Sequence, residues 1–264
     1  MRNYLVFDGE DSRDYDVYIS GNGTFNSPTR ALDMISIPGR DGDLLGTGSR
    51  LLNTTVTYPA FTHNLEKLAA FRSMLMSRTG YVRLTDSYHP DEYRMAVYRG
   101  ALEADMMDNL KAGEFDVTFE VMPQRWLLEG DNPLELWEYE DLTNESDVEL
   151  TTEDDVILEG ATTQIASGSL INPSPMEARP LIISTGPGTV TLGDQVITID
   201  VEAGVTVYID CEMMDAYTMS GDLMVSANQN VVFSGNDFPT LKAGETNVTY
   251  TTAGLEIVPR WWRV

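Results

Sequence analysis

The first half of the chain contains one segment with the hydrophobic spacing of a helix, at residues 64–76. Thr62 is placed to cap its start, Glu66 suits its first turn, and Gly80 is placed to stop it. We therefore expect a single α-helix in this half. The apolar side chains that recur there at intervals of three and four residues are Leu65, Leu68, Phe71 and Leu75.

Other segments of the first half have the alternating pattern of β-strands. Residues 115–121 alternate strictly between apolar and polar side chains. Weaker strand patterns at residues 80–84 and 93–98 flank a predicted turn at 87–91. The side chains that the strict alternation directs to one face are Phe115, Val117, Phe119 and Val121.

The second half of the chain is dominated by short strand patterns separated by turn residues. Gly193-Asp194 is the signal of a two-residue hairpin. Pro187 lacks the backbone N–H that a dinucleotide-binding loop would need, so residues 186–188 are expected to form a turn. Short strands at nearly regular spacing are typical of an antiparallel β-sandwich. The expected strands are residues 181–184, 189–192, 196–199, 205–209, 231–233, 248–250 and 255–258.

The size and composition indicate a folded chain with two domains. Of its 264 residues, 42% are hydrophobic, which is enough for a packed core. Residues 123–126 close the first block of strand and helix patterns. We therefore place a first domain at residues 1–130 and a second domain, which begins with an acidic connector, at residues 131–264.

The net charge of −25 is concentrated in one part of the chain. Residues 126–178 contain 14 acidic residues and no lysine or arginine. An acidic surface repels phosphate, so duplex binding by counterion release is disfavoured. Two interpretations of this segment are open: a solvated connector, and a surface past which nucleic acid slides without binding.

The sequence predicts no targeting or membrane segment. Residues 1–8 combine charges with a short apolar run and lack the apolar core of a signal peptide. No window approaches the ~18 apolar residues of a membrane span. We therefore expect a protein that is made in a cytoplasm and kept or assembled there. The single cysteine, Cys211, excludes an intrachain disulfide and a cysteine-based zinc cluster, and we expect it to be buried.

The sequence offers little catalytic or metal-binding chemistry. It has two histidines, His63 and His89, and no nucleophile elbow, zinc-protease motif or phosphate-binding loop. The acidic residues 8–16 begin like a calcium loop but lack its glycine and terminal glutamate, so we expect a polar loop. Adjacent carboxylates at 153–155 and 210–212 would face opposite sides of a strand, which argues against a glycosidase pair. We expect no catalytic residue, cofactor or metal site.

Aromatic side chains in the second half could form a sugar-binding platform, although most suit the core or rim of a sandwich. Trp261 and Trp262 are the candidates for exposure. Because neighbours in a strand face opposite ways, one can pack inside while the other contacts a partner. The other aromatic residues considered are Tyr208, Tyr217, Phe233, Phe238 and Tyr250.

A strand-like run at residues 34–37 leads into a segment with the composition of a stiff, tight loop. This loop can present the guanidinium of Arg40 to a carboxylate of a neighbouring subunit in a bidentate pair. The alternative is a strand-ending turn in which Arg40 pairs within its own chain. The candidate subunit-interface residues are Pro38, Gly39, Arg40, Asp41 and Gly42.

The order and spacing of several segments resemble a known family. In the first half these segments are residues 15–19, 35–42, 80–84, 113–119 and 123–127. In the second half they are residues 172–173, 178–183, 209–212, 216–217, 238–247 and 258–262. Together they resemble the distal tail protein family of long-tailed (siphovirus-like) phages that infect Gram-positive bacteria.

The resemblance implies a structural, non-enzymatic protein of the virion, located in the tail tip and assembled in the host cytoplasm. A β-sandwich-like N-terminal domain with one helix and an extended hairpin would form a homohexameric ring. A galectin-like antiparallel β-sandwich would project from it.

The ring would connect the tail-tube protein to the central tail-tip protein and carry receptor-binding protein or side fibres. Genome DNA would pass through its lumen without specific binding, which suits an acidic surface, and no membrane would be involved.

Two other functions stay open on the residues alone. A carbohydrate-binding module that contacts the host cell wall would need an exposed aromatic shelf or glycan binding in the second domain. A wall-degrading enzyme would need turnover of peptidoglycan or teichoic acid that depends on a carboxylate.

Overall fold

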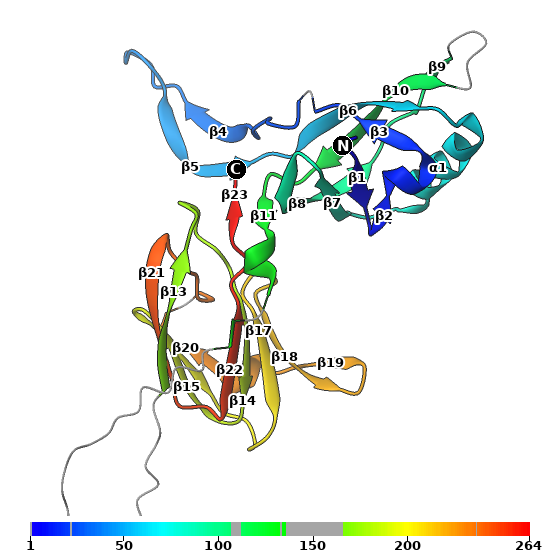
Figure 1. Ribbon diagram of the computed structural model, residues 1–264. Helices are drawn as coiled ribbons and strands as arrows, with labels where there is room; N and C mark the ends of the chain where they lie inside the picture. The colour runs from blue at the N-terminus through cyan, green and yellow to red at the C-terminus, as the bar shows by residue number, and fades with distance from the viewer. Residues whose placement is uncertain (1, 22, 107–111, 133, 136–165, 236) are drawn as a thin grey trace, which may run out of the picture. The chain divides into compact units, whose positions relative to one another are not determined.

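The structure is a computed structural model that describes residues 2–21, 23–106, 112–132, 134–135, 166–235 and 237–264 (Figure 1). Most of the acidic segment lies outside the described residues, at 136–165. The chain divides into two compact units, Met1–Glu129 with Trp262–Val264, and Gly130–Trp261. Both are built mainly of antiparallel strands, as the patterning predicts.

The first unit is organised around an antiparallel sheet with the strand order β2-β1-β7-β8-β10-β6-β3. β9 pairs with β10, and β11 pairs with both β8 and β23. The strands are β1 (Leu5–Phe7), β2 (Glu10–Asp11), β3 (Val17–Ile19), β6 (Thr54–Thr62), β7 (Val82–Asp86), β8 (His89–Tyr98), β9 (Ala104–Met106), β10 (Gly113–Val121), β11 (Arg125–Leu127) and β23 (Trp262–Arg263).

The core of the first unit lies on one face of this sheet. The alternation predicted for residues 115–121 is confirmed, because the four apolar side chains of β10 are all buried. The predicted helix is also confirmed as α1 (Leu65–Ser77), which buries Phe71 and Leu75 in the same core. The ring centroids of Phe71 and Phe115 lie 6.5 Å apart, so helix and sheet share one apolar cluster.

The ends of α1 differ from the prediction. Asn64, not Thr62, caps the helix: its Oδ1 accepts hydrogen bonds from the N–H groups of Glu66 and Lys67 at 3.2 and 3.4 Å. Asn64 directly precedes the first helical residue, whereas Thr62 still belongs to β6. Gly80 does not end the helix either, since α1 stops at Ser77 and the next residue is already extended.

The acidic stretch at residues 8–16 is not the plain loop we expected. It contains β2 and a 3₁₀ turn, η1 (Ser12–Tyr15). Asp11 caps η1 by accepting a hydrogen bond from the Arg13 N–H at 2.8 Å. Because Asp8 pairs with Arg78 at 2.5 Å, these carboxylates serve local structure rather than a metal loop.

The hairpin of β7 and β8 is tighter than predicted. Only Ser87 and Tyr88 form its turn, and the segment from His89 already belongs to β8. Asp86 Oδ1 accepts hydrogen bonds from the N–H groups of Tyr88 and His89 at 2.9 and 3.0 Å. A side chain that mimics a backbone turn in this way allows Pro90 to lie in the strand.

A separate two-stranded hairpin, β4 (Arg30–Ile35) and β5 (Leu44–Leu51), extends from the first unit (Figure 1). Its register shifts between Leu32 and Met34, which marks a β-bulge. This is the extended hairpin that the family resemblance implies.

The second unit is a sandwich of two antiparallel sheets (Figure 1). One has the order β12-β22-β14-β17-β18-β19 and the other β13-β21-β15-β16-β20. The strands are β12 (Leu134–Glu135), β13 (Ala166–Asn172), β14 (Leu181–Thr185), β15 (Gly188–Leu192), β16 (Gln195–Ile199), β17 (Thr206–Asp210), β18 (Asp215–Ser220), β19 (Leu223–Ser226), β20 (Val231–Phe233), β21 (Gly244–Tyr250) and β22 (Gly254–Val258). Two further 3₁₀ turns are η2 (Leu128–Asp131) and η3 (Asn228–Asn230).

All seven strands predicted for this half are present, and the Gly193-Asp194 turn joins β15 to β16 as expected. Gly193 has a φ of +62°, which the tight turn requires. The sequence patterns missed β12, β13, β18 and β19. These strands have few of the clustered β-branched residues that mark the others.

The last residues of the chain return to the first unit. β23 pairs with β11 through Arg125↔Arg263 and Trp126↔Trp262. The boundary predicted at 130/131 lies beside the division at 129/130, but residues 262–264, predicted to belong to the second domain, belong to the first unit. β23 has only two residues, which is too short for a hydrophobic pattern that would predict its partner strand.

Candidate interaction surfaces

The loop of residues 38–42 joins β4 to β5 at the end of the hairpin and is exposed. Gly39 and Gly42 have φ values of +85° and +78°, as a tight turn requires. The Arg40 N–H donates a hydrogen bond to the carbonyl oxygen of Ile37 at 3.2 Å. No atom lies within 4 Å of the position that a Cβ would take at either glycine, so the loop stands in open space.

The guanidinium of Arg40 has no hydrogen-bond or ion-pair partner among the residues that the structure describes. The alternative in which Arg40 pairs within its own chain is therefore not observed. A charged side chain on a stiff exposed loop is available to another molecule.

Large apolar side chains cover both strands of the hairpin and its loop. We call this set the hairpin apolar surface. Met34 and Leu45 are cross-strand partners and share one face of the hairpin, while Ile35 lies on the other face. Large apolar side chains exposed together often mark contacts with other proteins. The members and their exposed fractions are Leu32 (47%), Met34 (58%), Ile35 (53%), Ile37 (39%) and Leu45 (62%).

Two buried arginines fix the segment that leads into β4. The Thr24 carbonyl oxygen accepts hydrogen bonds from Arg94 at 2.9 Å and from Arg125 at 2.6 Å. Arg94 also donates to Asn26 Oδ1 at 3.0 Å. Burial, together with the neighbouring Arg125, lowers the pKa of Arg94 to about 10. The base of the hairpin is thus anchored although its far end is exposed.

Glu92 balances the charge of these arginines inside the first unit. Its carboxylate lies 3.6 Å from Arg125 Nη1 and also pairs with Arg263 of β23. The Glu92 side chain is only 5% exposed, so both contacts act where water screens little. Glu92 therefore ties the end of the chain to the same network that anchors the hairpin.

The described histidines, cysteine and acids form no group of three or more that could hold a metal ion. His63 is exposed beside the ring of Phe61, and His89 packs against Phe25 with ring centroids 4.5 Å apart. Burial raises the pKa of the Cys211 thiol to about 12, as suits the buried residue that we predicted.

Asp210, considered for a carboxylate pair, is engaged by Arg260. The two side chains form a bidentate contact at 2.7 and 2.9 Å. Burial opposes ionisation of Asp210, but hydrogen bonds from Arg260 and from the N–H groups of Glu212 and Met213 outweigh it, and its pKa is lowered. A carboxylate held in this way is a poor general acid. The other candidate, residues 153–155, lies outside the described residues.

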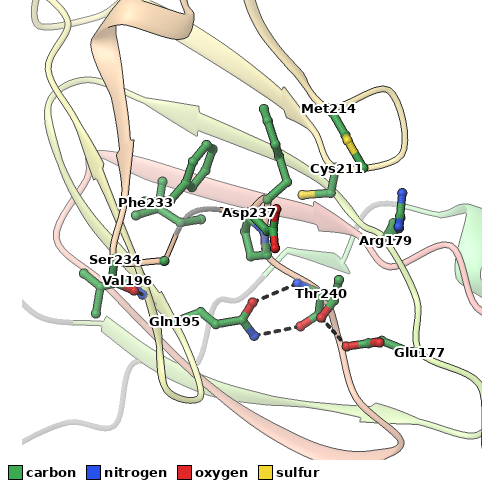
Figure 2. Close-up of a pocket in the computed structure, with 14 residues that line it drawn as sticks. Glu177, Arg179, Gln195, Val196, Cys211, Met214, Phe233, Ser234, Asp237 and Thr240 are labelled. Carbon is green, nitrogen blue, oxygen red and sulfur yellow. Dashed lines mark hydrogen bonds between the residues drawn. The ribbon is translucent and has the colours of Figure 1, made fainter. Parts of the chain in front are cut away.

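A cleft of about 460 Å³ opens in the second unit (Figure 2). The rings of Phe233 and Phe238 form part of its wall, with centroids 4.6 Å apart. Gln195 holds one side of the cleft through hydrogen bonds with the backbone N–H and carbonyl of Thr240, both at 3.0 Å. The exposed Arg179 adds a positive charge, so the cleft offers apolar and polar contacts together.

The two tryptophans near the C-terminus differ in exposure. Trp261 is only 4% exposed, so its prediction as an exposed aromatic is wrong. It packs over Gly130, where an added Cβ would come within 2.5 Å of the Trp261 backbone nitrogen. Trp262 is partly exposed and lies in β23. Tyr208 and Tyr217 stack at 5.3 Å on neighbouring strands rather than forming an open shelf.

Among the described residues, no helix has the length and apolar character needed to cross a bilayer.

Comparison with known proteins identifies the fold. No family model and no curated protein sequence matches the chain. The crystal structure of the Dit protein of phage SPP1, described as a paradigm of the hub adsorption apparatus in phages that infect Gram-positive bacteria, matches with a TM-score of 0.64 and 14% identity over 97% of both chains. A chain of the phage p2 baseplate in its activated conformation with strontium matches at 0.51 and 11%, again over 97% of both. The chain therefore has, over nearly its full length, the fold of a phage distal tail (hub) protein.

Proposed function

We propose that this protein is a structural hub of a phage tail tip. The observation that carries the proposal is the full-length match to SPP1 Dit, because it includes both units and not one common sandwich alone. A shared fold does not fix function by itself, so the exposed surfaces must support the role. The hairpin apolar surface and the loop at residues 38–42 do so, since both are suited to contacts between proteins.

We infer that the first unit forms a homohexameric ring through the β4–β5 hairpin. The hairpin apolar surface would pack on a neighbouring subunit. Arg40 would pair with a carboxylate of that neighbour. Water is excluded from such a contact, so the apolar side chains would supply most of its free energy and the ion pair its register.

The ring would sit between the tail-tube protein and the central tail-tip protein and carry receptor-binding protein or side fibres. Genome DNA would pass through its lumen. The net charge of −25 supports this, because acidic walls repel phosphate and allow passage without binding. The role is structural rather than enzymatic, in a virion component assembled in the host cytoplasm.

The mass of the purified full-length protein tests the ring. Native mass spectrometry or light scattering should give six times the chain mass of 29.3 kDa. Replacing Ile35 and Leu45 with threonine removes apolar area while keeping strand propensity. We expect at least a tenfold rise in the concentration needed for half assembly, and a smaller rise for Arg40→Ala.

Ile171→Thr is the matched control, since Ile171 is 69% exposed on β13 of the second unit. Assembly that survives the double change as well as it survives the control would contradict the role given to the hairpin.

The cleft in the second unit supports a second candidate function, contact with a cell-wall carbohydrate. Aromatic walls beside polar groups are typical of sugar sites. Titration with cell-wall oligosaccharides, followed by calorimetry, should show binding that Arg179→Ala weakens at least fivefold. Lys242→Ala, a change of an exposed cation that does not line the cleft, serves as the control. If Arg179→Ala and Lys242→Ala bind the oligosaccharides equally well, the cleft is not a carbohydrate site.

A further inference from the structure

The strand β19 is an exposed edge of the second unit. It is the last strand of its sheet, pairs only with β18, and extends with it beyond the other strands of the sandwich (Figure 1). All four residues of β19 are exposed, and three of them are large and apolar: Leu223 (72%), Met224 (54%) and Val225 (47%). Met219, opposite Met224 on β18, is 46% exposed.

The register of the hairpin determines which backbone groups of β19 are available. The Ala227 N–H donates to the Ala216 carbonyl oxygen at 2.7 Å, just beyond the pair Tyr217↔Ser226. Hydrogen-bonded and non-hydrogen-bonded pairs alternate along an antiparallel ladder. The N–H and C=O groups of Leu223 and Val225 therefore point to β18, and those of Met224 and Ser226 point away from it.

This edge lacks the features that normally prevent strand pairing. Edge strands are commonly protected by lysine, proline, a bulge or an inward-pointing charge. The sequence Leu-Met-Val-Ser has none of these, and the β18–β19 ladder is regular along its length. A row of unpaired backbone groups flanked by apolar side chains suits strand addition by another chain.

We propose that β19 is the docking edge for an extended apolar segment of a partner tail protein, with basic residues at the ends of that segment. The proposal rests on the proposed hub function and specifies where a peripheral component would attach. The added strand would pair with the backbone of Met224 and Ser226, and its side chains would contact Leu223 and Val225 on one face and Met224 on the other. Methionine side chains adapt to different neighbours, which suits such a surface.

The charge around β19 selects the kind of occupant. Residues 212–226 contain Glu212, Asp215 and Asp222 and no lysine or arginine. A second copy of the chain would bring the same acids and a net charge of −25, so self-pairing is opposed by repulsion. A segment with lysine or arginine at its ends would instead be attracted.

A synthetic peptide provides the probe. It has six alternating valine and threonine residues between pairs of lysine, and the control peptide has glutamate in place of lysine. Binding to the full-length protein is followed by fluorescence anisotropy. We expect the lysine peptide to bind at least tenfold more tightly than the glutamate peptide. It should slow hydrogen exchange within residues 221–228 at least fivefold.

The variant Met224→Pro isolates the backbone contact. Proline removes the outward N–H of residue 224 and leaves the bonds to β18 in place, a change that edge strands tolerate. It should weaken binding of the lysine peptide at least tenfold. Met213→Thr, a change that adds no charge at a residue 64% exposed in the turn before β18, should leave binding unchanged within twofold.

Three results would overturn the proposal: equal binding of the two peptides, unchanged binding by Met224→Pro, or a dimer of the chain that Met224→Pro abolishes. The last would make a second copy the occupant. The ring is tested separately, because Met224→Pro should leave a six-fold mass intact. If the chain stays monomeric but binds the lysine peptide, the result supports β19 as a docking edge and counts against the proposed hub function. If the chain has a six-fold mass but does not bind the peptide, the result supports the hub function and counts against the docking edge.

Discussion

At the scale of single residues, Gly130 and Trp261 show how closely the chain is packed where the second unit begins and ends. The Trp261 backbone nitrogen would lie 2.5 Å from a Cβ at Gly130, and the carbonyl oxygen of Gly130 accepts a hydrogen bond from the Arg260 N–H at 2.8 Å. If Gly130 moved away from Trp261, it would lose the hydrogen bond from the Arg260 N–H. The contact joins residues far apart in sequence, so no local pattern could predict it.

Gly130→Ala should therefore destabilise the second unit. Overpacking of this kind costs about 1–3 kcal/mol, and we expect the free energy of unfolding in urea to fall by that amount. Gly235→Ala is the control, because nothing lies within 4 Å of the position of its Cβ. Equal stability of the two variants would show that the backbone relaxes around the added methyl group.

The Asp210–Arg260 pair should make stability depend on pH. The pKa of Asp210 is lowered in the folded state, so its contribution is present above its unfolded pKa of about 4 and is lost as the pH falls through the folded value. Asp210→Asn should cost about 2 kcal/mol at pH 7, since it leaves Arg260 without its partner. Urea unfolding at pH 7 and pH 3 should show a smaller difference for this variant than for the unchanged protein.

Asp222→Asn provides the comparison, since Asp222 is exposed in the turn before β19. It should keep the pH dependence of the unchanged chain. If the free energy of unfolding of Asp210→Asn still falls steeply at acid pH, carboxylates other than Asp210 cause the pH dependence.

At the scale of elements, the sequence patterns predicted what local spacing determines. The structure confirms the helix predicted at residues 64–76 and the strict alternation in β10. Both could be predicted because an element that buries one face places its apolar residues at a regular spacing. The end of β18 and all of β19 are exposed, so burial selects no alternation there and the sequence pattern missed these strands. The exposure of the β4–β5 hairpin could not be predicted either, because its apolar residues have the pattern of a buried strand.

The anchor at the base of the hairpin can be tested with Arg125→Met. The change removes the hydrogen bonds to the carbonyl oxygens of Thr24 and Asn26 while keeping side-chain volume. Hydrogen exchange within residues 23–29 should speed up at least tenfold, because Arg125 then no longer holds the carbonyl groups of Thr24 and Asn26.

Arg99→Met is the matched control, since Arg99 is 71% exposed and pairs with Glu120 at the surface. Unchanged exchange in Arg125→Met would show that the remaining contacts, among them those with Arg94, are enough to hold the segment.

At the scale of the whole molecule, the net charge of −25 opposes the assembly that we propose for the exposed hairpin. Six copies in one ring would accumulate this charge, and salt screens repulsion between exposed groups over about 10 Å at 0.1 M. The apolar contact itself depends little on sodium chloride. Where most of the charge lies could be read from the sequence, whereas the surfaces that offset it became visible only in the fold.

We therefore expect the proposed ring to become more stable as sodium chloride rises from about 0.05 to 0.5 M, because the Debye length shortens and repulsion between subunits is screened. Sedimentation of the full-length protein at fixed concentration should show a growing share of the six-fold species. Dissociation in salt would indicate instead that ion pairs such as that proposed for Arg40 dominate the contact.

The pairing of β11 with β23 makes the second unit an insertion within the first. The chain leaves the first unit at Glu129 and re-enters it at Trp262, and the strands on either side of this gap lie side by side through Trp126↔Trp262. A two-residue Asn-Gly turn could join Trp126 to Trp262 in place of residues 127–261. The sandwich of the second unit is in this sense a single insertion, which another domain could replace while β11 and β23 of the first unit stay paired.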